Sequence, residues 1–494
     1  MKSFLDVEVN RVNYHKSANK NSVHRSSLIV PKFKQAISNI SFINHFLLKR
    51  NNTNVMLKIT AINNEGIAED SSSFEINQPI VYSFNLEDYF NKVLKIKEYL
   101  IEFYSDKNLF IPFPAVMINH IGNDFVNCVH SYNRVLNDVF ENDKVNQHQV
   151  YESSIDVSID KNYDTFFNFA TGPFKAKKNL KVILGEKSKN SKKIPTKMPR
   201  LTNKNIFLSD FYKKNLKSNS LLKILQPEQI LFYGRLLAGK INRKTKAFSA
   251  NHSYYDSSSN KEYFNNSISM RAYPFFNNSL NKITMYPIMS PSLLEVYIEI
   301  YKSNAIYKSK IKKLKSPSNN AISFDINELI NESGFDDVSM FKVIAKSVKG
   351  KIPTRVNHQL IYGAQETTSK LQSSINVSLG NESIYLPPHK KGMIWGQVLK
   401  HRHYKSRLGI CFNNNNGGSD KVSIDFYSKV GLIKSIKRNL TLNNSIIFDN
   451  NFFNKLKASN EFIWYVVKSN RADLQAESFH YHSQSGNASG EHNF

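Results

Sequence analysis

The sequence predicts a mostly β protein built from about three tandem β-sandwich modules with a few short helices. Three observations lead to this fold class. Short segments alternate apolar and polar side chains, turns rich in Asn, Ser and Gly separate them, and one longer pattern of segments recurs three times in the 494 residues. Such closely spaced strands and turns are typical of sandwiches and barrels. With 40% hydrophobic and 12% aromatic residues, the chain can fill several packed cores.

The repeated pattern has four parts in a constant order. An alternating strand comes first, then an aromatic residue followed by Asn or Asp, then an apolar strand that ends in serine, and finally a histidine. The alternating strands begin at Val55, Leu294 and Val422, and the aromatic residues are Phe84, Phe324 and Phe448. The serines are Ser105, Ser347 and Ser469, and the histidines are His120, His358 and His480. The constant order indicates three copies of one module.

Two shorter similarities set the predicted boundaries. SSIDVSI (residues 153–159) resembles SSINVSL (373–379), and YGRLLAGK (233–240) resembles WGQVLKHR (395–402). The first of these copies is much longer between its two elements, which predicts an insertion. We therefore expect modules at 1–172, 227–380 and 381–494, with a basic insertion or linker at 173–226. In their strand pattern the modules resemble immunoglobulin-like sandwiches.

Few segments have helical spacing. Residues 86–100 (LEDYFNKVLKIKEYL) fit a helix or a helical crossover, and residues 326–333 (INELINES) fit a shorter one. Asp325 and Asp449 each follow an aromatic residue, so they are expected to accept backbone N–H bonds at a turn. The two cysteines, Cys128 and Cys411, lie far apart and form no CxxC pair. A disulfide framework or a zinc ribbon is therefore not expected.

The chain is strongly basic, with 67 Lys and Arg against 40 Asp and Glu and a formal charge of +27. Abundant Asn, Lys and Ile are also what an AT-rich genome produces, so part of this charge has a compositional explanation. Between residues 175 and 217 there are 14 basic and two acidic residues. This segment reads either as a solvated linker or as an arm for a polyanion, an acidic polysaccharide or a nucleic acid. The candidate polyanion-binding residues are Lys175, Lys177, Lys178, Lys192, Lys193, Lys197 and Arg200.

The last residues, HYHSQSGNASGEHNF (480–494), hold the strongest candidate for a metal site. His480 and His482 are two residues apart and should share one face of a strand. A glycine-rich turn follows, so Glu491 and His492 should return beside them. Imidazoles and a carboxylate suit Zn²⁺, Fe²⁺ or Mn²⁺. The alternative is structural, because the second copy keeps only His358.

A similar hairpin is expected in the first copy. His120 and His130 flank a Gly-Asn-Asp turn and should lie nearly opposite each other. A repeated lone histidine is usually structural, with its ring packed and hydrogen-bonded at a strand end.

These features favour a non-enzymatic protein for binding or assembly, whose partners are further copies of itself or other proteins. The sequence has no Gly-rich phosphate loop, GxSxG or HExxH motif, and no catalytic residue is assigned. The alternatives are a metal-dependent enzyme acting on a carbohydrate or other polymer, and nonspecific polyanion binding through the basic insertion. No signal peptide or transmembrane segment is recognisable, which predicts a cytoplasmic protein by default.

Overall fold

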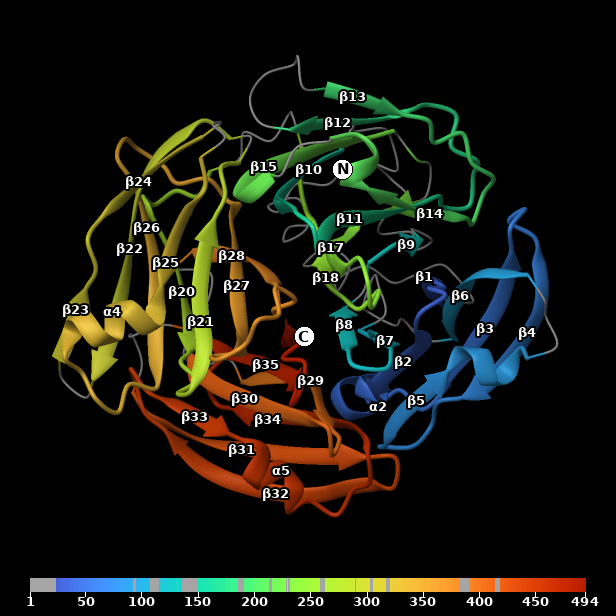
Figure 1. Ribbon diagram of the computed structural model, residues 1–494. Helices are drawn as coiled ribbons and strands as arrows, with labels where there is room; N and C mark the ends of the chain where they lie inside the picture. The colour runs from blue at the N-terminus through green and yellow to red at the C-terminus, as the bar shows by residue number, and fades with distance from the viewer. Residues whose placement is uncertain are drawn as a thin grey trace. The chain divides into compact units, whose positions relative to one another are not determined.

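The computed structural model divides the chain into two compact units, residues 1–262 and 263–494. The residues that the structure describes are 24–91, 95–106, 115–130, 132–135, 150–184, 191–212, 216–227, 229, 232–257, 263–288, 290–302, 305–316, 320–381, 391–413 and 418–494. Strands make up most of both units (Figure 1). The prediction of a mostly β, multi-module sandwich fold is confirmed.

One arrangement of eight strands occurs four times, twice in each unit. If the strands of a module are counted in chain order, one row of hydrogen-bonded strands has the order 1-6-3-4 and the other has the order 5-2-7-8. The two rows are separate sheets in modules 1, 2 and 4, whereas in module 3 strand 1 also pairs with strand 8 and joins them into one nine-stranded sheet. Every pairing within these sheets is antiparallel. A short helix joins strand 5 to strand 6 in each module.

The first unit contains modules 1 and 2. Module 1 consists of β1 (His24–Pro31), β2 (Ile37–Ile43), α2 (His45–Arg50), β3 (Val55–Asn63), β4 (Ala68–Glu75), β5 (Val81–Asn85), η1 (Leu86–Tyr89), β6 (Ile96–Ser105), β7 (Met117–Ile121) and β8 (Val126–His130). Module 2 consists of β10 (Val150–Ile159), β11 (Tyr163–Ala170), β12 (Leu180–Leu184), β13 (Ser191–Ile194), β14 (Asn203–Phe207), η3 (Leu208–Asp210), β15 (Leu216–Gln226), β17 (Leu237–Asn242) and β18 (Phe248–His252). The short strands β9 (Arg134–Val135), β16 (Phe232–Tyr233) and β19 (Tyr254–Ser257) extend these sheets at their edges.

The second unit contains modules 3 and 4. Module 3 consists of β20 (Ile268–Pro274), β21 (Ser279–Met285), β22 (Ser292–Lys302), β23 (Ala305–Lys308), β24 (Lys312–Ser316), β25 (Ile322–Asp325), α4 (Ile326–Ser333), β26 (Met340–Ser347), β27 (Val356–Ala364) and β28 (Ile375–Asn381). Module 4 consists of β29 (Gly392–Lys400), β30 (Tyr404–Phe412), β31 (Asp420–Ser428), β32 (Gly431–Leu440), β33 (Ser445–Phe448), α5 (Asn450–Asn454), β34 (Glu461–Ser469), β35 (Leu474–His482) and β36 (Ala488–His492). In module 3 strand 4 is β24, and β23 adds a further pairing along β22.

Alternation along the strands builds the cores. In β31, Val422, Ile424 and Phe426 are all fully buried and face the inside of module 4. They pack in one cluster with Leu408 and Ile410 of β30, which belongs to the other sheet. Because successive side chains of a strand point to opposite faces, the apolar set of each sheet meets that of its partner.

In modules 3 and 4, the helix between strands 5 and 6 begins directly after an aspartate. The Asp325 side chain accepts hydrogen bonds from the backbone N–H of Asn327 and Glu328, and α4 follows. The Asp449 side chain accepts from the backbone N–H of Phe452 at the start of α5. Both aspartates accept backbone hydrogen bonds as predicted, and both act as N-caps.

Residues 173–226 are not a linker, and this prediction was wrong. The segment supplies strands β12 to β15 of module 2. Nine of the fifteen members of the module 2 core come from it, among them Leu180, Val182 and Ile224. Its lysines alternate with these apolar residues, so the segment forms half-buried strands whose charged side chains face outward. The strand pair β12–β13 within it is called the ribbon below.

The count of about three modules was too low, because the longer pattern does not occur in module 2, and the predicted boundaries came from a false equivalence. Residues 153–159 lie in strand 1 of module 2, whereas most of 373–379 lies in strand 8 of module 3. Residues 233–240 run into strand 7 of module 2, whereas 395–402 lie largely in strand 1 of module 4. The longer four-part pattern was correct, because its members occupy strands 3, 5, 6 and 7 of modules 1, 3 and 4. The helix expected at residues 86–100 is shorter than predicted, because η1 spans only Leu86–Tyr89 and β6 begins at Ile96.

None of the helices in the described residues is both long and apolar enough to cross a lipid bilayer.

A substitution in the ribbon tests whether residues 173–226 are part of a core. Leu180→Ala removes a fully buried side chain from module 2 and is expected to destabilise that module by about 2–5 kcal/mol. Lys192→Ala, at an exposed position of the neighbouring strand, is the matched control and should change stability by less than about 0.5 kcal/mol. Calorimetric unfolding measures both, and equal effects would contradict the strand assignment.

Candidate functional site

The histidine-rich end of the chain is the hairpin between strands 7 and 8 of module 4. In its turn the His482 N–H donates to the Asn487 carbonyl at 2.9 Å, and the Gly486 N–H donates to the His482 carbonyl at 2.9 Å. Gly486 has a φ of 72°, a left-handed conformation that favours glycine. The hairpin of module 2 makes the same two bonds between Asn242, Lys246 and Ala247. The segment is therefore a repeated structural turn.

The four predicted metal ligands do not all face one way. His480 and His482 share one face of β35, and the register places Glu491 on that face. His492 pairs with Glu477 on the opposite face. Glu491 and His492 nevertheless approach each other at the end of β36, with 3.7 Å between Glu491 Oε1 and His492 Nε2.

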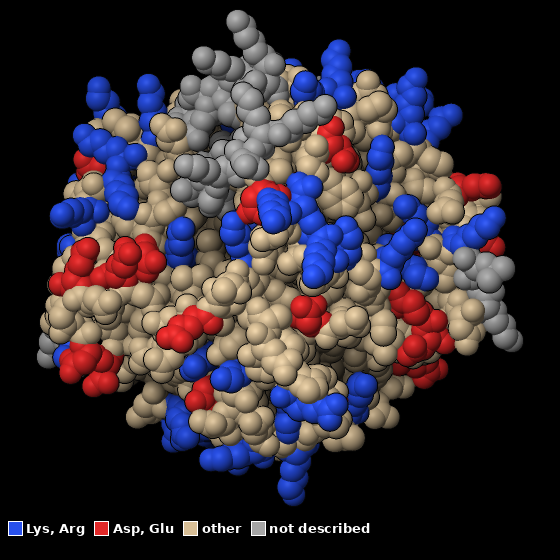
Figure 2. Space-filling model, in the orientation of Figure 1, with Lys and Arg blue, Asp and Glu red and all other residues tan. Residues whose placement is uncertain are grey.

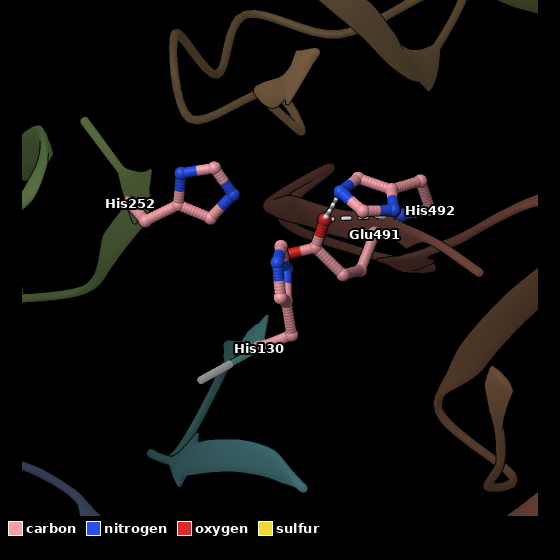
Figure 3. A group of neighbouring side chains, drawn as sticks. All are labelled: His130, His252, Glu491 and His492. Carbon is pink, nitrogen blue, oxygen red and sulfur yellow. Dashed lines mark hydrogen bonds and ion pairs between the residues drawn. The ribbon is translucent and has the colours of Figure 1, made fainter. Parts of the chain in front are cut away.

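A second pair of ligand-type side chains lies in the first unit, where β8 and β18 end. The rings of His130 and His252 are perpendicular, with centroids 4.5 Å apart, and both residues are buried. Arg235 Nη1 lies 3.3 Å from His252 Nδ1. Figure 3 shows this histidine pair and the Glu491–His492 pair as sticks.

Each pair offers two groups that suit a divalent metal, whereas protein zinc sites usually use three or four protein ligands. Taken one unit at a time, the described residues contain no group of three or more His, Cys, Asp or Glu with ligand atoms within 4.8 Å of one another. Metal binding at His480, His482, Glu491 and His492 therefore stays a prediction.

His252 was missed from the sequence, although a signal for it exists. Leu237 pairs with His252 in module 2, and Glu477 pairs with His492 in module 4. The two hairpins are thus offset by the same 240 positions throughout. Comparing the chain with itself at that offset would have aligned His252 with His492.

The histidines on strand 7 are structural in modules 1 and 3. His120 and His358 are fully buried, and burial lowers the pKa of each to about 3. His120 Nε2 lies 3.2 Å from the Tyr132 hydroxyl, and His358 Nε2 is hydrogen-bonded to the Tyr273 hydroxyl. Both imidazoles are therefore held neutral within a packed core.

The expected facing of His120 and His130 was wrong. The register of β7 and β8 pairs His120 with Asn127 and His130 with Met117. The two histidines are therefore separated along the hairpin, and the His130 ring contacts that of His252 in module 2 instead.

Buried carboxylates lie where two modules of one unit meet. Glu98 of module 1 is fully buried and accepts a hydrogen bond of 3.0 Å from Asn203 Nδ2 of module 2. In the second unit, Arg271 of module 3 pairs with the fully buried Glu477 of module 4 at 3.1 Å. Burial raises the pKa of Glu98 to about 8 and that of Glu477 to about 7, although its partner Arg271 acts in the opposite direction.

All seven predicted polyanion-binding residues are exposed and lie on the ribbon of module 2 or next to it. Strand pairing sets Lys181 of β12 directly opposite Lys193 of β13. The bridge between Ala176 and Met198 continues this pairing toward the ends of the ribbon. Lys177 and Lys197 are the sequence neighbours of these two bridged residues, and both lie between the bridge and the paired strands.

Comparisons with known proteins give little similarity. No protein-family model matches the chain, and no curated protein matches it. Among solved structures, Bacteroides uniformis beta-glucuronidase 2 covalently bound to cyclophellitol-6-carboxylate aziridine is 11% identical, with a TM-score of 0.15, and the match covers 48% of this chain and 27% of that one. A marsupial T cell receptor is 8% identical, with a TM-score of 0.10, and the match covers 69% of this chain and 98% of that one. Neither likeness supports an argument about function.

The Glu98 carboxyl should give the first unit a characteristic pH dependence. Its pKa is raised from 4.5 to about 8, so the folded protein keeps a proton that the unfolded chain releases. The stability that this retained proton contributes is complete below pH 4.5 and is lost as the pH rises through 8, a change on the order of 5 kcal/mol. Glu98→Gln cannot ionise and should become more stable than the wild type as the pH rises across this window.

Calorimetric unfolding between pH 4.5 and 8.5 measures the difference. Glu69→Gln, which changes an exposed carboxylate of the same module, is the control and should follow the wild-type curve. If Glu98→Gln also runs parallel to the wild type, the buried carboxyl does not retain its proton.

Proposed function

We propose that the protein is a modular β-sandwich scaffold that binds a linear polyanion along the outer face of the ribbon β12–β13. The observation that carries this proposal is the direct opposition of Lys181 and Lys193, extended by Lys177 and Lys197. Like charges that face each other across two strands destabilise a sheet by up to about 1 kcal/mol for each pair. A phosphate or sulfate group between them would turn this repulsion into attraction.

Among the residues that the structure describes, no ion pair with a carboxylate relieves this repulsion. In the described part of the chain, no carboxylate forms an ion pair with Lys177, Lys181, Lys193 or Lys197. Leu180 and Val182 anchor the ribbon in the core of module 2 from its inner face. The lysines are therefore presented by a packed strand pair, which lowers the conformational entropy that binding would cost.

The other modules provide an internal comparison. In module 3 the same two strands pair Glu295 with Lys313. In module 4, Asp425 on strand 3 accepts a hydrogen bond from Ser435 and lies 3.7 Å from Lys468 Nζ. Module 1 places Lys58 opposite Ser73. Unbalanced lysine pairs are thus a feature of module 2, which argues against a purely compositional origin for this patch.

The ligand is defined by charge more than by shape. Lysine is a point charge without the planar fork by which arginine reads bases or carboxylates, so the contact should be unspecific in sequence. Figure 2 shows Lys and Arg side chains spread over the face that it draws, with Asp and Glu in smaller groups. The net charge of +27 would steer any polyanion toward the protein.

The salt dependence of binding tests the proposal. Changing Lys177, Lys181, Lys193 and Lys197 to Ala should lower affinity for single-stranded DNA and reduce the slope of log K against log salt by about 3. Fluorescence anisotropy between 50 and 300 mM NaCl measures the slope, and a heparin arm separates sulfated from phosphate polyanions.

The matched control is a variant with Lys421, Lys434, Lys437 and Arg438 of module 4 changed to Ala. It removes the same charge from the equivalent strands of another module. Equal slopes for the two variants would show that the net charge, and not the ribbon, holds the polyanion.

A further inference from the structure

We infer that copies of this protein associate head to tail, with the edge strand β4 of one copy against the edge strand β32 of another. This inference is independent of polyanion binding, because neither strand belongs to the ribbon of module 2. Both are strand 4 of their modules, and both end a sheet. An edge strand presents unpaired backbone N–H and C=O groups that can pair with another chain.

The edge β4 is acidic. Its sequence is AEDSSSFE, most of it is exposed, and it carries Glu69, Asp70 and Glu75. Two of these carboxylates accept hydrogen bonds from neutral amides, because Asn63 Nδ2 donates to Glu69 and Asn77 Nδ2 donates to Glu75. Within the described residues of the module, no ion pair cancels the negative charge of this edge.

The edge β32 is basic and also exposes apolar side chains. Its sequence is GLIKSIKRNL, and Lys434, Lys437 and Arg438 are exposed. At the turn that leads into it, Val430 is 85% exposed and Leu432 is 55% exposed. Scattered exposed apolar residues are common, but two of this size beside a free edge add area that a partner can cover.

The charges permit only one of the three possible pairings. Two β4 edges would oppose carboxylates to carboxylates, and two β32 edges would oppose cations to cations, so like pairs repel. Only β4 against β32 brings opposite charges together, which gives orientation as well as attraction. A contact between two different surfaces of the same protein is heterologous, so each bound copy leaves a further edge available.

The other basic edges fit β4 less well. β13 has only four residues. The strands that pair along the outer side of β22 are also short, because β23 has four residues and β24 has five. β32 has ten residues and β4 has eight. Between Asp70 and Glu75, β4 pairs with β3 without a register shift, so this part of β4 offers a regular edge to a partner strand.

Charge reversal separates this interface from others. Asp70→Lys with Glu75→Lys makes both edges basic, and Lys437→Glu with Arg438→Glu makes both edges acidic. Each variant alone should self-associate roughly tenfold more weakly, or worse, than the wild type. An equimolar mixture of the two should associate again, as should one chain that carries all four changes.

Sedimentation velocity of nuclease-treated protein at 50 mM NaCl measures association, with Lys312→Glu and Lys313→Glu on β24 as the control. Raising the salt to 0.5 M should dissociate the assembly, because screening shortens the reach of exposed charges. A wild-type protein that stays monomeric at 50 mM NaCl would overturn the inference. So would an oligomer that persists in both single-edge variants, because it would use another surface.

Discussion

The closure of two four-stranded sheets over a shared apolar layer is the constraint on which the rest of this structure depends. Each strand contributes alternate residues to the layer, as Leu180 and Val182 do in module 2 and Ile424 and Phe426 do in module 4. The remaining residues of a strand must then face outward, to solvent or to another module. Every candidate function of the chain lies in this second, outward set.

Packing of two modules within a unit buries some of these outward-facing residues. Where two modules meet, outward residues become buried, and the chain places carboxylates and histidines there. Glu98 meets Asn203 in the first unit, and Arg271 meets Glu477 in the second. A buried charge is costly unless it is paired or neutralised, so these contacts are stable only when the carboxyl keeps a proton or a hydrogen bond. Ionisable groups in this chain are therefore as much a part of module packing as of any chemistry.

The repeated fold also shows how one module diverges while its core is kept. The same pair of strands is acidic at the edge in module 1, rich in opposed lysines in module 2, mixed in module 3 and basic at the edge in module 4. The inner residues stay apolar in all four modules. Outward positions of strands 3 and 4 can change without touching the core, and recognition in this chain is expected to differ between modules for that reason.

The sequence by itself determined the β-sandwich class, the strands with regular alternation, the backbone hydrogen bonds that Asp325 and Asp449 accept, and the pattern repeated in three copies. Each of these depends on local periodicity or on nearest neighbours. It did not reveal module 2, because strand 7 of that module lacks the marker histidine and its lysines resemble those of a solvated linker. Strands with alternating apolar and polar residues also have similar sequences wherever they lie in a module. For this reason strand 1 of module 2 was matched with strand 8 of module 3. The pairing of Lys181 with Lys193 and the meeting of His130 with His252 were decided by tertiary structure, since register and module packing join residues that no local pattern connects.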